Sequence, residues 1–269
     1  MKILDIIEEM SHEDPELPER LDTRRSAMSR FAGLGGKLAL AALPLALGGL
    51  LKKAYGQTTS SIVDILNYAL TLEYLESTFY TTGAASGVVP AGTPAVAAIN
   101  TIRDHENEHV AFLTSVIKSM NATPVTKPNF DFTAGGTFPN VFTNYDTFLA
   151  VAQAFEDTGV RAYKGRAVEL MSNSVVLTAA LQIHSVEARH ASHIRQMRAA
   201  RGANEKPWIT GNDTGGIGPA VQSSYNGEEN TIQGGVNITN FVNINAATES
   251  FDEPLTASQV LAIVKPFIV

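Results

Sequence analysis

Two Glu-x-x-His motifs contain the residues of this sequence that are best suited to chemistry. They are Glu106/His109, within His-Glu-Asn-Glu-His, and Glu187/His190, within His-Ser-Val-Glu-Ala-Arg-His. On an α-helix, residues at this spacing lie one above the other, so the carboxylate and imidazole of each motif point the same way. Such a pair can chelate a transition metal. Two pairs on two helices therefore predict a site for two metal ions.

Each motif is preceded by a glutamate and a tyrosine at matching spacing. Glu73 precedes the first motif and Glu156 the second, and a tyrosine follows each of them in a Glu-x6-Tyr pattern. This weak internal repeat predicts two helical hairpins related by a pseudo-twofold axis. The predicted metal ligands are Glu73, Glu106, His109, Glu156, Glu187 and His190, and the predicted catalytic residues are Tyr80 and Tyr163.

The four glutamates fall on the apolar stripes of four expected helices, at matching depth. Buried carboxylates that were ionised and unpaired would each cost several kcal/mol. Two divalent metal ions would balance the charge of four glutamates, and two neutral imidazoles would complete the ligand set. The alternative is a polar bundle core of protonated glutamates and histidines without metal.

Other polar residues near the motifs receive different interpretations. Glu76, one turn after Glu73, is expected to be a solvated surface charge rather than a ligand. His105 and His184 are expected beside the main pairs, either supporting them or at the surface, and His193 is a candidate extra ligand. The two tyrosines are either ordinary core aromatics, or hydrogen-bond donors to ligand carboxylates or redox-active neighbours.

Composition bounds the class of protein. The chain has 269 residues, 44% of them hydrophobic, which is enough for a sizeable core. A formal net charge of −7 argues against nucleic acid as the main partner. The sequence contains no cysteine, which excludes disulfides, thiolate zinc sites and cysteine-ligated iron centres.

Residues 1–57 are expected to be an export signal or an N-terminal extension. Arg24 and Arg25 precede an apolar run over residues 31–51, and small residues surround a candidate cleavage point after Gly56. The pattern resembles a twin-arginine signal and predicts export to the periplasm. The alternatives are an uncleaved membrane anchor, which would be the chain's only membrane contact, and a cytoplasmic extension.

The remaining chain is predicted to be all-α, with a four-helix bundle over residues 58–202. The four helices are expected near 60–81, from Pro94 onward, over 144–171, and from after Asn173 to about Arg201. A long crossover over 121–143 joins the second helix to the third. Residues 203–269 form a mostly irregular C-terminal extension that packs on the bundle, with a short strand at 236–242 and a last helix at 257–265.

The six-ligand pattern resembles the ferritin-like superfamily of di-iron carboxylate proteins, in which two helices give one glutamate each and two give Glu-x-x-His. The order of ligands and tyrosines is similar to that of bacterioferritins and rubrerythrins. The tail from Phe251 to Val264 resembles the bacterial ferritin-like domain proteins that are related to plant desiccation-related proteins.

Three departures from these relatives matter. Bacterioferritins place a haem-ligating methionine directly after the second-helix glutamate, where this chain has Asn107, so no haem is expected. Rubrerythrins carry a cysteine-ligated iron domain, which a chain without cysteine cannot form. The long tail stands in place of the short fifth helix of cage ferritins, so a storage shell is not expected, and a smaller homo-oligomer is left open.

The resemblance implies a protein that binds two iron ions and oxidises Fe(II) with O2 or H2O2 in oxidative or desiccation stress. One alternative is a dimanganese catalase, whose ligand set is similar. The other is a non-enzymatic exported stress-protection protein with a structural metal site.

Overall fold

The structure is a computed structural model that describes residues 59–269. The predicted export signal or N-terminal extension, residues 1–57, lies outside the described residues. Four long helices form the bundle, namely α4 (Thr59–Ser86), α5 (Pro94–Ser119), α6 (Tyr145–Ala167) and α7 (Ser174–Ala199). The predicted all-α four-helix bundle is confirmed. Within residues 59–269 no helix has the length and apolarity that crossing a membrane would require.

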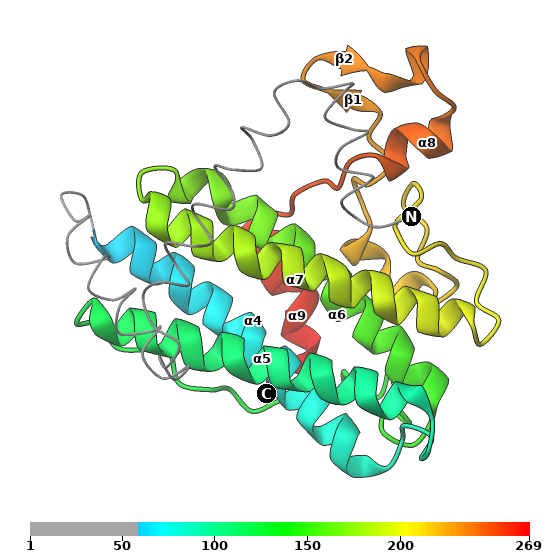
Figure 1. Cartoon of the computed structure of the whole chain (residues 1–269), viewed down its shortest axis with the longest axis horizontal. Coiled ribbons are helices and arrows are strands. Elements are labelled where there is room, and N and C mark those ends of the chain that lie inside the picture. Colours follow the sequence, from blue (N-terminus) through cyan, green and yellow to red (C-terminus); the bar gives the residue numbers. More distant parts are fainter. Residues whose placement is uncertain (1–58) are drawn as a thin grey trace, which may run out of the picture. The chain divides into compact units, whose positions relative to one another are not determined.

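The helices pair into two antiparallel hairpins (Figure 1). α4 packs along α5 and α6 along α7, whereas the contacts between the hairpins, α4 with α6 and α5 with α7, are much sparser. The crossover over residues 120–144 runs along the bundle from the end of α5 to the start of α6. This is the connection that the loss of periodicity in the sequence predicted.

Side-chain caps mark the starts of α6 and α7, and a proline marks the start of α5. The side chain of Asn144 accepts a hydrogen bond from the Thr147 amide at the start of α6. Asn173 caps α7 in the same way. At α5, Pro94 occupies the first turn as predicted, but the Thr93 side chain does not cap the helix and instead donates to the carbonyl of Pro90 at 2.7 Å. Proline therefore opens this helix, because its ring already holds the helical φ angle.

α4 continues beyond its predicted end near residue 81 and reaches Ser86. The prediction treated Gly83 as the start of a loop. In the structure Gly83 is helical, and the ring of Phe148 packs directly over it, where a β-carbon would stand 2.3 Å from Phe148 Cε2. The helix thus continues through this position despite the low helix propensity of glycine.

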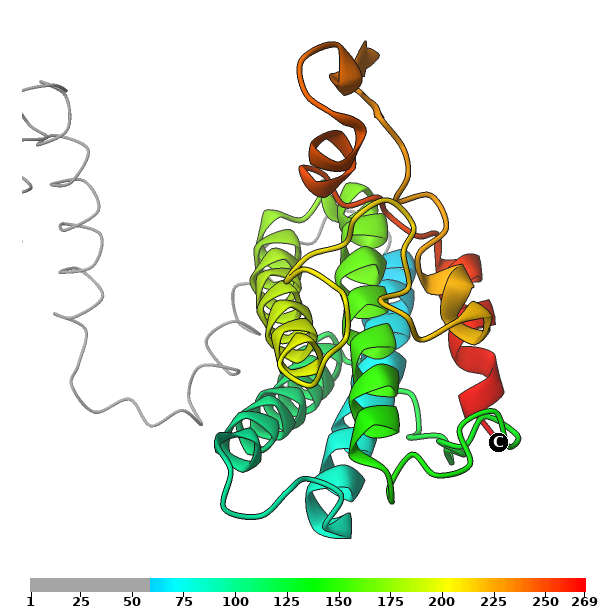
Figure 2. The ribbon, with the colours of Figure 1, turned by 90° about the vertical axis from the view of Figure 1, so that its right-hand side faces the viewer.

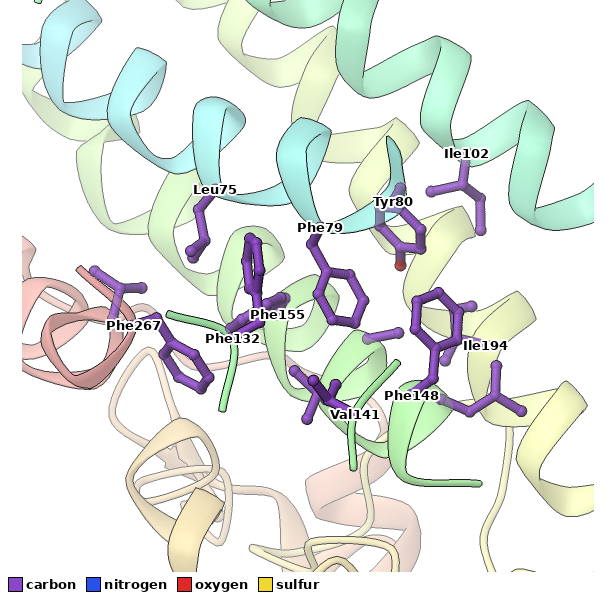
Figure 3. Packing of buried hydrophobic residues seen from close by; sticks show 14 of the residues in the cluster. Leu75, Phe79, Tyr80, Ile102, Phe132, Val141, Phe148, Phe155, Ile194 and Phe267 are labelled. Atoms are coloured by element: carbon purple, nitrogen blue, oxygen red, sulfur yellow. The ribbon is translucent and has the colours of Figure 1, made fainter. Parts of the chain in front are cut away.

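An aromatic cluster fills the core at this end of the bundle (Figure 3). Phe79 stacks on Phe148 with ring centroids 4.8 Å apart and meets Phe155 edge to face at 5.2 Å. Phe155 in turn contacts Phe267, from the last residues of the chain, at 4.8 Å. The C-terminal segment is therefore part of the bundle core.

The C-terminal extension contains several short elements, namely η3 (Pro219–Ser224), β1 (Ile232–Gln233), β2 (Val236–Asn237), η4 (Ile238–Asn240), α8 (Ile244–Glu249), α9 (Ala257–Val264) and η5 (Lys265–Phe267). The strand predicted at 236–242 is shorter, because only Val236–Asn237 pairs, with Ile232–Gln233 in antiparallel register. α9 lies against α6, as expected of the last helix, and Ile268 bridges to Phe130 of the crossover.

Candidate metal centre

The six predicted ligand side chains come together between the four long helices. α4 provides Glu73, α6 provides Glu156, and α5 and α7 provide one Glu-x-x-His motif each. All four glutamates are 0% exposed. The helical spacing that the sequence predicted therefore orients every one of these side chains inward.

The donor atoms fall into two groups that share two carboxylates. Glu73 and His109 complete one group, Glu156 and His190 complete the other, and Glu106 and Glu187 belong to both. Within each group the donor atoms lie within 4.8 Å of one another, so each group could hold a metal ion. Glu106 and Glu187 therefore offer donor atoms to both groups.

Each imidazole directs one nitrogen into a set of three carboxylates. Nδ1 of His109 lies 3.2 Å from Glu73 Oε2 and 3.2 Å from Glu187 Oε1. Nδ1 of His190 lies 2.9 Å from Glu106 Oε1 and 3.3 Å from Glu156 Oε2. The pseudo-twofold relation of the sequence repeat thus reappears in the arrangement of donor atoms.

Several of these buried atoms make no hydrogen bond of good geometry among the described residues, although Nδ1 of His190 lies at ion-pair distance from three carboxylates. They include both carboxylate oxygens of Glu106 and of Glu187, one oxygen of Glu156, and Nδ1 of His190. Buried polar atoms are normally paired, and unpaired ones are costly. A group of convergent, unsatisfied oxygen and nitrogen donors is the arrangement that bound cations would satisfy, so the residues fit a pair of divalent metal ions.

The two tyrosines connect the hairpins. The hydroxyl of Tyr80, on α4, donates to Oε1 of Glu156 at 2.5 Å, and the hydroxyl of Tyr163, on α6, donates to Oε1 of Glu73. Each tyrosine therefore orients the single glutamate of the opposite hairpin. Burial and the adjacent carboxylate raise the pKa of both hydroxyls well above the ordinary value, so they stay protonated as donors.

Burial and the mutual charges of the side chains raise the pKa of several groups in the metal-free centre. Burial raises the pKa of Glu156 to about 7, and burial together with the charge of Glu187 raises that of Glu106 well above its ordinary value. Burial opposes a charge on His190, but the surrounding carboxylates outweigh it and raise the pKa of this ring to about 12. Without metal, the centre therefore holds protons that metal ions would displace.

Glu76 corrects one expectation. The sequence analysis interpreted it as a solvated surface charge, but the side chain is 3% exposed and its pKa is raised well above normal by burial and by the charges of Glu187 and Glu106. It is a fifth buried carboxylate beside the centre, although it belongs to neither donor group. Its spacing from Glu73, the same as that within each Glu-x-x-His motif, was the available signal, because residues at this spacing share a helix face.

The remaining histidines occupy three different environments. Nδ1 of His105 lies 3.0 Å from Nε2 of His190, so His105 contacts the ring nitrogen that faces away from the carboxylates. Nδ1 of His184 lies 3.0 Å from the carbonyl oxygen of Val160. His193, the candidate extra ligand, is exposed and belongs to neither donor group.

A network of buried arginines lies beyond the centre, and the sequence analysis missed it. Arg195 binds Asp157 with two hydrogen bonds, one of them at 2.6 Å. Arg161 donates to the carbonyl of Glu253 at 2.8 Å and lies 2.7 Å from Oε1 of Glu228. These side chains attach the C-terminal extension to α6 and α7.

Comparison with known proteins identifies one family. The model of a family described as a ferritin-like domain matches residues 61–200. This range contains every donor of the centre and all four long helices except the first two residues of α4. No curated protein matches the chain.

Proposed function

The chain belongs to the ferritin-like domain family, and from that premise we propose that it binds two iron ions and oxidises Fe(II) with O2 or H2O2. One observation carries the proposal. Glu106 and Glu187 each belong to both donor groups, so the two groups are close enough to share bridging ligands. A redox-active pair of metal ions bound at this site would supply the electrons that reduce O2 or H2O2.

The donor set supports iron as the bound metal. Carboxylate oxygens predominate, with one imidazole nitrogen in each group, and such donors suit hard or intermediate divalent ions. The four glutamates of the two donor groups carry the charge that two divalent ions would balance. Because these glutamates are completely buried, water does not compete with them for the metal ions. Tyr80 and Tyr163 would hold Glu156 and Glu73 in position by donating to Oε1 of each carboxylate, which leaves Oε2, the oxygen beside His190 or His109, free to bind a metal ion.

Metal loading followed by exposure to oxygen tests the proposal. Full-length protein loaded anaerobically with Fe(II) is expected to hold about two irons per chain, counted by elemental analysis. Adding O2 should then produce near-ultraviolet Fe(III) absorbance faster than in buffer alone. Glu106→Ala and Glu187→Ala should each lose most of the iron, because each removes a donor from both groups. Glu108→Ala is the matched control, since this glutamate is exposed on the same helix.

The outcomes separate the alternatives. Two tightly bound irons that oxidise no faster than in buffer would contradict the enzymatic part and favour a stress-protection protein with a structural metal site. Manganese in protein from the native host, with rapid disproportionation of H2O2, would favour a dimanganese catalase, because the same donors accept manganese. A His109→Ala/His190→Ala variant that retained two metals at unchanged affinity would overturn the ligand assignment.

A further inference from the structure

A groove of about 820 Å³ lies between the N-terminal half of α5 and the C-terminal half of α7. Figure 2 shows these two helices on the side of the bundle that faces away from α9. Metal ions and O2 need no such space, whereas sites for small organic molecules occupy about 300–1,000 Å³. The hollow exists because α5 and α7 contact each other sparsely and present alanines, including Ala98 and Ala200, to the gap.

The floor of the groove reaches the metal centre. His105 and His190 both line it, and Nδ1 of His105 lies 3.0 Å from Nε2 of His190. The other nitrogen of His190 is the one that lies 2.9 Å from Glu106 Oε1. A single imidazole ring therefore separates the groove from the donor atoms of the centre.

The walls are apolar and the rim carries an exposed arginine. Ala98, Ile102 and Met197 contribute apolar surface, while Arg189 and His193 are exposed at the edge. Within residues 59–269, Arg189 makes no ion pair, and the described lining of the groove contains no aspartate or glutamate. Arg201 also lines the groove but pairs with Asp146, so within residues 59–269 Arg189 is the arginine of the lining that has no ion pair. An unpaired guanidinium attracts anions.

We propose that the groove binds an apolar organic molecule that carries a carboxylate. Its apolar part lies along Ala98, Ile102 and Met197, and its carboxylate pairs with Arg189, whose guanidinium suits bidentate contact with a carboxylate. The bound molecule thereby lies next to the centre. The binding itself stands on the groove alone, whereas any chemistry on the bound molecule rests on the proposed function of the metals.

Titration with decanoate tests the proposal. Calorimetry on the full chain is expected to show one decanoate bound per chain and much weaker binding of 1-decanol, which lacks the charge. Ala98→Trp, which fills the groove, and Arg189→Glu, which reverses the charge of the rim, should each weaken binding at least about tenfold. The matched controls are Ala111→Trp and Lys118→Glu, since both residues are exposed on α5 and lie outside the groove.

Other results would overturn the proposal. Decanoate that fails to bind, or that binds both groove variants as tightly as the unaltered protein, shows that the groove is not its site. A chain that self-associates and becomes monomeric on Ala98→Trp or Arg189→Glu shows that a second copy covers the groove instead. Because Arg189 is exposed, Arg189→Glu remains informative if Ala98→Trp does not fold.

One variant separates this proposal from the function proposed for the metals. Glu106→Ala removes a donor of the centre but does not line the groove. It is expected to lose metal and still bind decanoate with unchanged affinity. Loss of decanoate binding in this variant, with the fold intact by circular dichroism, contradicts a groove that binds on its own.

Discussion

Gly159 on α6 lies opposite the carboxylate of Glu76 on α4, where a β-carbon on the glycine would stand 3.1 Å from Glu76 Oε1. In the internal repeat these two positions are equivalent, because Glu76 follows Glu73 at the spacing at which Gly159 follows Glu156. The side chain that one half lacks makes room for the extra carboxylate of the other. The centre is therefore asymmetric at this position, with five buried glutamates where two divalent ions balance only four.

We expect Glu76→Gln to raise the reduction potential of the iron-loaded centre. Oxidation of iron adds positive charge, which an ionised Glu76 would offset, whereas burial keeps this carboxyl protonated when the charge is lower. Glutamine has the same shape as glutamate but cannot lose a proton when the iron is oxidised. The expected increase is on the order of 50 mV, close to the 59 mV that corresponds to a factor of ten for one electron.

A spectroelectrochemical titration measures this potential, and Glu108→Gln provides the control because Glu108 is exposed on α5. Equal potentials in Glu76→Gln and the control would mean that Glu76 keeps its proton in both oxidation states.

Tyr80→Phe is expected to destabilise the metal-free protein. The change removes the hydroxyl that donates to Glu156 Oε1 and leaves a buried carboxylate oxygen unpaired. The free energy of unfolding should fall by about 1–3 kcal/mol, the typical penalty for an unsatisfied buried polar group. Urea unfolding measures it, with Tyr74→Phe as the control, since the Tyr74 hydroxyl makes no hydrogen bond to the described residues. Similar losses in both variants would contradict a specific role for this hydrogen bond.

The main features of the centre were predictable because they depend on helical spacing alone. Glu106 with His109, and Glu187 with His190, have to share a helix face, and the repetition of the pattern identified Glu73 as a partner. Glu76 carried the same spacing but had no imidazole partner and no glutamate at the equivalent place in the repeat. The space left by Gly159, a tertiary feature, accommodates its buried side chain.

Features that depend on distances between helices were not predictable. The groove beside His190 results from the separation of α5 and α7, which no periodicity encodes. The predicted end of α4 was wrong because the helix continues through Gly83, against which Phe148 packs from a distant part of the chain. α8 was missed because it is a single short helix among asparagines and threonines, whose caps resemble loop sequence.

Metal affinity is expected to rise with pH through about 7 and to continue rising above it, because a metal ion must also displace the proton of His190, whose pKa is raised to about 12. Burial raises the pKa of Glu156 to about 7, so below that pH a metal ion must displace its proton. The metal-free protein should show the opposite trend. Because the folded-state pKa of Glu156 exceeds its ordinary value of 4.5, the folded form binds more protons between these values and its stability falls as pH rises through them.

The raised pKa of His190 also lowers the stability of the metal-free protein as pH rises above 6.5, the ordinary pKa of histidine. Thermal unfolding with and without metal at pH 5 and pH 8 tests the two trends together. The metal-induced increase in Tm should be larger at pH 8. An increase that is the same at both values, with metal saturating in each case, would mean that binding releases no protons.

Gly165→Ala is expected to loosen the C-terminal extension from the bundle. An added β-carbon at this position of α6 would stand 1.9 Å from the carbonyl oxygen of Leu255, so the backbone of the extension has to move. That movement would strain the hydrogen bond from the Leu255 amide to the Arg161 carbonyl, now 3.2 Å. Alanine favours a helix over glycine by up to about 1 kcal/mol, but overpacking typically costs about 1–3 kcal/mol.

We therefore expect a net loss of stability for Gly165→Ala in urea unfolding and faster proteolytic cleavage within residues 203–256. Gln182→Ala is the control, because it places an alanine on the exposed face of α7 and leaves the extension untouched. Val260, Val264 and Phe267 belong to the bundle core, so the extension cannot detach without exposing apolar surface. If Gly165→Ala stabilised the protein as much as Gln182→Ala, the close approach of Leu255 to α6 would not contribute to holding the extension in place.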